Sequence, residues 1–222
     1  MNILENIENK YGFTYPQIYH QLFDDNMLEY GELGSNWYKE TYPKLKEFPP
    51  LLLLSNDYEP LTFDDIQYEI DSFKDPDDYR QTKRELNFIP FAISGAGDLY
   101  CFFLNEQDGD NVPIVYVWHD MNEVDYRAKN LQDFIYISLI DRVFNKEDFN
   151  ELSGNDLKES CLKTLKSHSK YLTKEQIRSI ELVFNKEFEE KVELTKEEYE
   201  GIINKNAPFS KYNNSFKYQS HT

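Results

Sequence analysis

The middle of the chain constrains the fold more than any other segment. It holds three apolar stretches of strand length, Phe88–Ser94, Leu99–Leu104 and Val112–His119. Residues 95–98 (Gly-Ala-Gly-Asp) join the first two, and a polar turn over 107–111 joins the last two. Because short turns rich in Gly, Asn and Asp connect antiparallel neighbours, the segment predicts a three-stranded antiparallel meander.

The third of these stretches is apolar on nearly both faces. Val115 and Val117 alternate with Ile114, Tyr116 and Trp118. A strand that is apolar on both faces is typical of the interior of a sheet, not of its edge. We therefore expect this strand to have a neighbour on each side.

Helix signals precede and follow the meander. Asn2 can cap a first helix that ends at Gly12, and Pro16 suits the first turn of a second helix. Thr62, with an acidic residue three positions later, begins another helix, and Asn130 can cap a helix after the meander.

The apolar run Leu51–Leu54 follows two prolines. A short apolar run bounded by turn residues is consistent with a buried strand. We therefore expect a short buried strand at this position.

The pattern changes after residue 148. Three helical segments follow, beginning near Asn155, at Thr173 and at Thr195, and the last two carry capping boxes. The tail from Pro208 is polar and is expected to be loosely held. The sequence thus predicts an α+β domain over 1–148, with a mostly antiparallel sheet flanked by helices, and an α-helical C-terminal extension over 149–222.

The charge of the chain is strongly acidic and unevenly distributed. The 222 residues include 24 basic and 41 acidic side chains, and residues 1–148 carry the whole formal net charge of −17. Such a chain repels phosphates and anionic lipids, which argues against nucleic-acid or membrane partners. The acidity either serves solubility or steers a basic protein partner.

Cysteine usage and the N-terminus indicate the compartment. Cys101 and Cys161 are far apart and have no metal-ligand spacing, so a disulfide scaffold and a cysteine zinc site are not expected. The first residues lack the basic and apolar regions of a signal peptide, and no apolar run is long enough to span a bilayer. We expect a soluble, cytoplasmic protein.

Two glycine-containing turns resemble ligand loops only superficially. Gly97 and Asp98 precede a strand, not a helix, so this turn is no dinucleotide loop. Gly97 is expected to supply a positive φ and Asp98 to hydrogen-bond its own turn. The turn at Asp108 and Asp110 lacks the glutamate that a calcium loop needs at position 12, where His119 stands.

The dipeptide His119-Asp120, with Asp98, leaves a metal-dependent hydrolase as a minor alternative. Metal chemistry usually needs further ligands, and neither His20 nor His168 has ligand spacing to this pair. The chain also lacks a nucleophile elbow, a P-loop and a zinc-protease motif. A binding protein without catalytic residues, metal or cofactor is therefore favoured over an enzyme.

An ordered set of short motifs resembles the SUKH superfamily, the Smi/Knr cell-wall-assembly-regulator-like family. The set covers about residues 1–140 and, in chain order, consists of Gly12, Pro16 with Tyr19 and Leu22, Ile89-Pro90-Phe91, Gly97-Asp98, Tyr100–Phe103, Val115–His119, and Leu131 with Phe134. The chain departs from this family by lacking its usual Gly-Gly within 24–50 and by continuing beyond its domain.

The resemblance implies an α+β fold and a binding function. Bacterial members are typically immunity proteins that bind and neutralise a cognate toxin, often a nuclease, and eukaryotic members look like signalling scaffolds. We therefore expect an immunity or antitoxin protein that binds a basic toxin stoichiometrically. The alternative is a cytoplasmic regulatory or interaction scaffold without a toxin, and the C-terminal helices also allow a homodimer.

The residues expected to bind the partner lie in acidic loops and at the end of the third strand. They are Asp57, Glu59, Asp64, Asp65, Asp75, Asp77, Asp78, Asp108, Asp110, Trp118, His119 and Asp120. A second set is expected to shape the fold and comprises Pro16, Pro90, Gly97 and Asp98.

Overall fold

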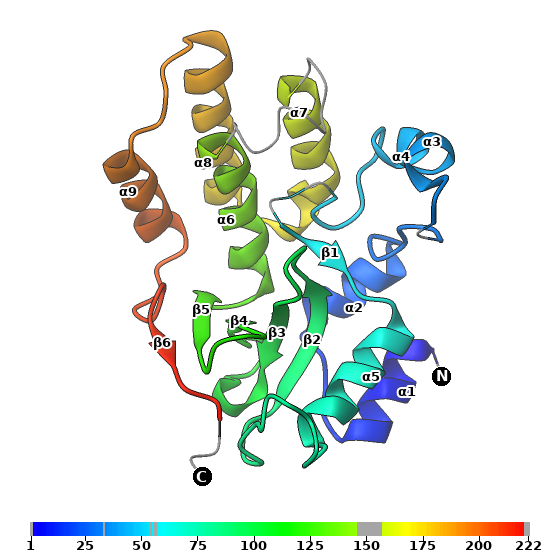
Figure 1. Ribbon diagram of the computed structural model, residues 1–222. Coiled ribbons are helices and arrows are strands. Elements are labelled where there is room, and N and C mark those ends of the chain that lie inside the picture. The colour runs from blue at the N-terminus through cyan, green and yellow to red at the C-terminus, as the bar shows by residue number, and fades with distance from the viewer. Residues whose placement is uncertain (1, 33, 54, 56, 146–156, 220–222) are drawn as a thin grey trace. The chain divides into compact units, whose positions relative to one another are not determined.

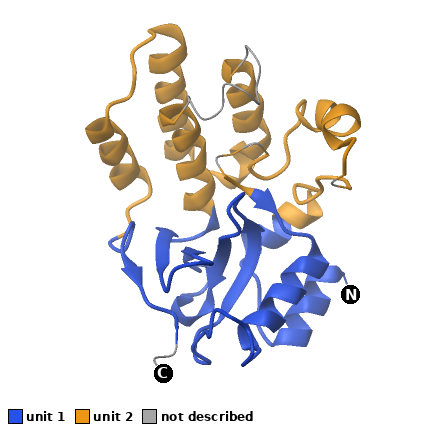
Figure 2. Cartoon of the chain, in the orientation of Figure 1, with its two compact units in different colours: residues 1–21, 59–131, 210–222 blue, residues 22–58, 132–209 orange. Residues whose placement is uncertain are grey.

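The computed structural model describes residues 2–32, 34–53, 55, 57–145 and 157–219 (Figure 1). The chain forms two compact units, each built from separate stretches of sequence (Figure 2). Unit 1 comprises residues 1–21, 59–131 and 210–222, and unit 2 comprises residues 22–58 and 132–209. The domain boundary expected at residue 148 lies outside the described residues and stays a prediction.

Unit 1 contains a six-stranded antiparallel sheet in which the strands lie side by side in chain order. The strands are β1 (Glu59–Pro60), β2 (Phe88–Ile93), β3 (Leu99–Phe103), β4 (Ile114–Val117), β5 (Val124–Ala128) and β6 (Ser215–Phe216). This arrangement confirms the α+β class and the central meander. The short strands β1, β5 and β6 extend the sheet beyond the three strands expected from the sequence.

The register of the meander places the third expected strand inside the sheet. Tyr100 of β3 lies opposite Tyr116 of β4, and Val117 of β4 pairs with Val124 of β5. Every residue of β4 is buried. The prediction from two-faced apolarity is therefore confirmed, because an interior strand contacts other elements on both faces.

The N-terminal helices begin and end where their capping residues stand. Asn2 caps α1 (Ile3–Tyr11), which ends at Gly12 with a φ of 74°. That angle lies in the left-handed region, which glycine adopts without a Cβ clash. Thr62 caps α5 (Phe63–Lys74) by accepting the N–H of Asp65, and the Tyr11 hydroxyl of α1 donates to the Gln67 carbonyl of α5 at 3.1 Å.

Two neighbouring phenylalanines of β3 belong to different aromatic clusters. Phe102 contacts Tyr15, Tyr19 and Phe91, with centroid distances of 5.9, 5.3 and 4.8 Å. Phe103 instead packs on Phe88, Tyr126 and Phe216. Because successive side chains of a strand point to opposite faces, aromatic residues fill both faces of the sheet at β3.

Unit 2 is helical. Its elements, of which α2 and α6 begin in unit 1, are α2 (Gln17–Asp24), α3 (Trp37–Glu40), α4 (Tyr42–Leu45), α6 (Leu131–Phe144), α7 (Leu157–His168), α8 (Lys174–Phe184) and α9 (Lys196–Asn206). Three short turns complete the described helical elements of the chain: η1 (Leu104–Glu106) in unit 1, and η3 (Ser169–Tyr171) and the π-helical η4 (Asn185–Glu189) in unit 2. Among the described residues, no helix is long and apolar enough to cross a membrane.

The capping boxes expected after residue 148 are both present. Thr173 caps α8 and Thr195 caps α9, and each also donates its backbone N–H to the side chain of the third helical residue. The start expected near Asn155 lies outside the described residues, and α7 is described from Leu157. Stacking of Phe144 on Tyr199, at a centroid distance of 4.6 Å, ties α9 to α6.

The prediction of a short strand at Leu51–Leu54 is wrong. Residues 51–53 are buried but form a turn, with Leu52 at a φ of 52°, and Leu54 lies outside the described residues. The N–H of Leu51 donates to the Met27 carbonyl at 2.8 Å, and that of Leu53 donates to the Pro50 carbonyl at 3.1 Å. Burial of an apolar run does not require a strand when its backbone groups find such partners.

The prediction that the tail from Pro208 is loosely held is also wrong for the residues that the structure describes. β6 pairs with β5, and Thr82 forms a further bridge with Gln219. The side chain of Tyr218 is fully buried, and its hydroxyl donates to the Trp118 carbonyl at 3.0 Å. The tail is polar in composition, but a strand at a sheet edge needs only its backbone and a few anchoring aromatic residues.

Candidate functional site

The turn between β2 and β3 and the connection that follows β4 lie at the same end of the sheet. The β2–β3 turn covers residues 94–98, and β3 starts at Leu99, which pairs with Val117 at the end of β4. Asp98 and the segment Trp118–Asp120 therefore lie next to each other. The sequence predicts Asp98 in a turn and the segment Trp118–Asp120 at the end of a strand.

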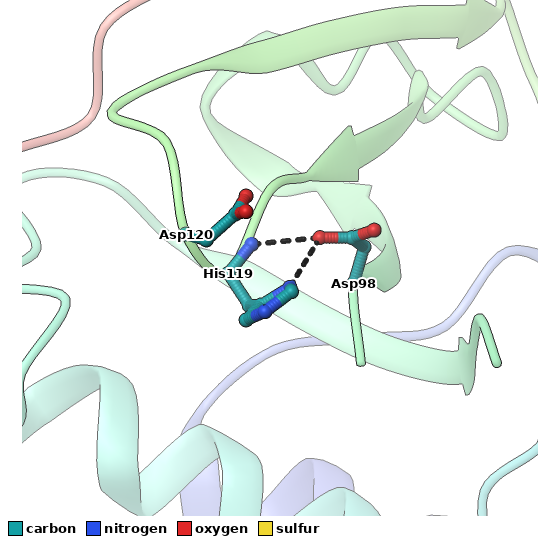
Figure 3. A group of neighbouring side chains, drawn as sticks. All are labelled: Asp98, His119 and Asp120. Atoms are coloured by element: carbon teal, nitrogen blue, oxygen red, sulfur yellow. Dashed lines mark hydrogen bonds and ion pairs between the residues drawn. The ribbon is translucent and has the colours of Figure 1, made fainter. Parts of the chain in front are cut away.

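Asp98 is the centre of this end of the sheet (Figure 3). One of its carboxylate oxygens accepts the backbone N–H and the ring Nδ1–H of His119, both at 2.8 Å. The other oxygen accepts the hydroxyl of Tyr116 at 2.8 Å and that of Ser94 at 3.3 Å. The expected bond of Asp98 to its own turn is confirmed, and the bonds to His119 and Tyr116 additionally lock the turn to β4.

The hydrogen bonds keep the buried carboxylate ionised. Burial by itself would raise the pKa of Asp98, but the bonds from His119 and Tyr116 outweigh burial and hold the pKa below its usual value. Tyr116 as a partner of Asp98 was not predicted from the sequence, where it stands out only as a residue of a buried strand. A buried tyrosine hydroxyl needs a hydrogen-bond partner, and this requirement is the signal that points to it.

The arrangement fits a hydrogen-bonded turn better than a metal centre. Ligand atoms of Asp98, His119 and Asp120 lie within 4.8 Å of one another, the group that the minor hydrolase alternative requires. However, each Asp98 oxygen already accepts two hydrogen bonds, so a cation would have to displace them. His119 and Asp120 alone offer fewer protein ligands than catalytic zinc sites use.

Trp118 is held in place from both sides. Its indole N–H donates to Asp125 at 3.0 Å, and its ring meets Tyr116 edge-on at 5.1 Å. With the Tyr218 hydroxyl bound to its carbonyl, the residue has few alternative positions. The half-buried ring presents a fixed surface.

The segment after α5 contains a buried arginine. Arg80 is 5% exposed and donates to Glu69 at 2.8 Å and to both oxygens of Asp78 at 2.9 and 3.0 Å. Its guanidinium lies 4.3 Å from the ring centre of Phe73. Burial tends to raise the pKa of Asp78, but the Arg80 bonds lower it below its usual value, so Asp78 is a structural carboxylate.

Asp75 and Asp77 remain exposed on the same segment. Asp75 accepts the N–H of Asp77 at 2.9 Å, which fixes the turn. The residues that follow this segment reach the strand ends through the tail, since the Lys83 N–H donates to the Tyr218 carbonyl at 2.9 Å and the Tyr218 hydroxyl donates to the Trp118 carbonyl at 3.0 Å. We call the set Asp75, Asp77, Trp118, His119 and Asp120 the acidic end.

The other acidic residues of the predicted set lie on other segments of the chain. Asp108 and Asp110 lie in the β3–β4 connection, at the opposite end of the strands. Asp64 and Asp65 lie in the first turn of α5, where Asp65 takes part in the cap. Glu59 is exposed on the edge strand β1, opposite Ile93. Asp57 is exposed and belongs to unit 2.

The residues expected to shape the fold occupy special backbone positions. Gly97 has a φ of 101°, and a Cβ built on it would lie 3.9 Å from the His119 ring. Pro90 is buried in β2 at a register shift against β3. The carbonyl of Pro16 accepts the N–H of Tyr19 at 2.9 Å at the start of α2.

The comparisons with known proteins identify a family. No curated protein and no solved structure matches the chain. A family model does match it, that of the SMI1 / KNR4 family (SUKH-1), over residues 2–137. The match covers more than half of the chain and includes the whole meander together with its Asp98 turn. The chain therefore belongs to the SMI1 / KNR4 (SUKH-1) family.

Proposed function

We propose that this protein is a cytoplasmic immunity protein that binds a cognate protein toxin stoichiometrically and neutralises it without turnover. Family membership supports a binding role, because the family is generally non-catalytic. The observation that carries the proposal is the acidic end, whose exposed carboxylates neighbour two hydrogen-bonded pairs in sequence. Asp98 bonds to His119 and Asp78 bonds to Arg80, while Asp75, Asp77 and Asp120 remain exposed.

The charge of this surface favours a basic partner. A toxin that acts on nucleic acid must bind phosphates, so its cleft is basic. Complementary charge accelerates association with such a cleft by about 10–1000-fold. The half-buried rings of Trp118 and His119 supply preorganised contacts, which limits the entropy lost on binding.

The experiment identifies the partner first and then tests the surface. The tagged full-length chain is captured from its host, and a stoichiometric partner is identified by mass spectrometry. Expressed alone in a heterologous cell, this partner should stop growth, and co-expression of the immunity protein should restore it. A host that yields no toxic partner would leave the scaffold function as the better explanation.

Two matched triple variants then test the placement of the binding surface. The first carries D75N, D77N and D120N, and the second carries D64N, D108N and D110N, so each removes three exposed carboxylates. Asp78 is left intact because its loss would free the buried Arg80. We expect the first triple to weaken toxin binding at least about tenfold, mainly through a slower association rate, and the second to change it only slightly. Equal losses in both triples would show that the charge acts without a defined face.

A further inference from the structure

A groove with a volume of about 770 Å³ lies between α8 and α9 of unit 2. It is formed entirely beyond residue 137, where the family match ends. Val183 and Leu194 are buried in its floor, and Leu182 on its wall is 63% exposed. An ion pair between Lys186 and Glu198, at 2.6 Å, bridges the two helices.

A glycine inside α9 keeps this groove open. Gly201 lies in the helix interior, where glycine is a poor helix former. A Cβ built at this position would have no atom within 4 Å. Larger residues would therefore fit the fold and favour the helix, but they would fill the groove. Glycine at this position weakens the isolated helix, but it leaves room for a side chain of another molecule to enter the groove.

We infer that this groove is the docking surface for a second copy of the same chain. The net charge of −17 lies within residues 1–148, whereas residues 149–222 carry no net charge. Two identical acidic chains repel each other most strongly through the first region. The helices after residue 148 are therefore where two copies can approach with the least repulsion.

The groove is also complementary to itself, as a two-fold symmetric interface requires. It carries a protruding apolar residue, Leu182, and an open position at Gly201, so each copy can place its leucine in the groove of the other. Its charged lining contains both signs, with Arg178 and Lys205 as well as Glu175. A symmetric pairing can therefore match opposite charges around an apolar centre.

Sedimentation velocity of the full-length chain over a range of concentrations tests this inference. We expect the unmodified chain to dimerise. G201L should be monomeric and should also raise the Tm by roughly 2–4 °C, because it improves the helix while filling the groove. L182E should weaken the dimer by roughly 100-fold, since the symmetry introduces the change twice.

A matched control separates the groove from general surface effects. Leu162 of α7 is 46% exposed and does not line the groove, so L162E should leave the dimer unchanged. A monomeric unmodified chain at high concentration would overturn the inference. An equal loss of dimer in L162E and L182E would also overturn it. If the chain is monomeric and L182E instead loses toxin binding, the groove belongs to the toxin interface and not to a second copy.

Discussion

The ring Nε2 of His168 accepts the backbone N–H of Leu52 at 3.0 Å, across 116 residues of sequence. His168 is fully buried at the end of α7, and its Nδ1–H donates to the Thr164 carbonyl at 2.8 Å. Both ring nitrogens are therefore used by the neutral imidazole, one as a donor and one as an acceptor. This bond fixes the turn at Leu52 to the helix and gives its N–H a partner that no strand supplies.

The first prediction is that the protein loses stability as the pH falls from about 6.5 to 4. Burial lowers the pKa of His168 to about 4, whereas the unfolded chain protonates it near 6.5. Within this window the unfolded state binds a proton that the folded state excludes. The free energy of unfolding should fall by about 1.4 kcal/mol per pH unit, or about 3 kcal/mol in all, measured by urea denaturation.

A variant isolates this histidine from the carboxylates that titrate in the same range. H168Q can still accept the Leu52 N–H, but it has no proton to bind. The stability difference between the unmodified chain and H168Q should therefore shrink as the pH falls from 7 to 5. Parallel pH profiles of the two proteins would contradict the assignment.

The second prediction concerns the carboxylate of Asp98. D98A should lower the free energy of unfolding by about 3 kcal/mol, because the buried hydroxyl of Tyr116 and the part-buried N–H groups of His119 lose their acceptor. D98N keeps one oxygen and should cost about 1–2 kcal/mol. The neighbouring exposed residue serves as a control, and D120N should change the stability by less than about 0.5 kcal/mol. A D98A protein as stable as D120N would show that the turn is held by other contacts.

The third prediction concerns the guanidinium of Arg80. R80K should destabilise by about 1–3 kcal/mol, since an ammonium cannot bind Asp78 and Glu69 in the same fork geometry. R80M should cost about 3–5 kcal/mol by leaving two part-buried carboxylates unpaired. R84K, at an exposed position nearby, is the matched control and should be neutral. Chemical denaturation measures all three, and a neutral R80M would refute the role of this ion pair.

The fourth prediction is that the C-terminal tail contributes to the stability of the sheet. Y218A should cost about 3–4 kcal/mol, because it removes a fully buried ring. Y218F keeps the ring and loses only the bond to the Trp118 carbonyl, at a cost of about 1 kcal/mol. Urea denaturation distinguishes the two. If both variants unfold at the same urea concentration as the unmodified chain, the tail does not hold the sheet.

The sequence was most informative where the determining interactions are local. The turns of the meander, the caps at Asn2, Thr62, Thr173 and Thr195, and the interior position of β4 all follow from short patterns, and the structure confirms each. The motif order also led to the family. Within the site, the turn-forming role of Gly97 and Asp98 was predictable because both act within a few residues.

Tertiary structure decided what depends on distant partners. The strands β5 and β6 form because β4 offers an edge and Tyr218 finds a buried place beside Asn122 and Trp118, about a hundred residues earlier in the chain. The three acidic residues after α5 looked alike in sequence, yet Asp78 became structural while Asp75 and Asp77 stayed exposed. Composition alone shows that carboxylates are abundant. Only the position of Arg80 determines which of these three carboxylates is held inside and which remain exposed.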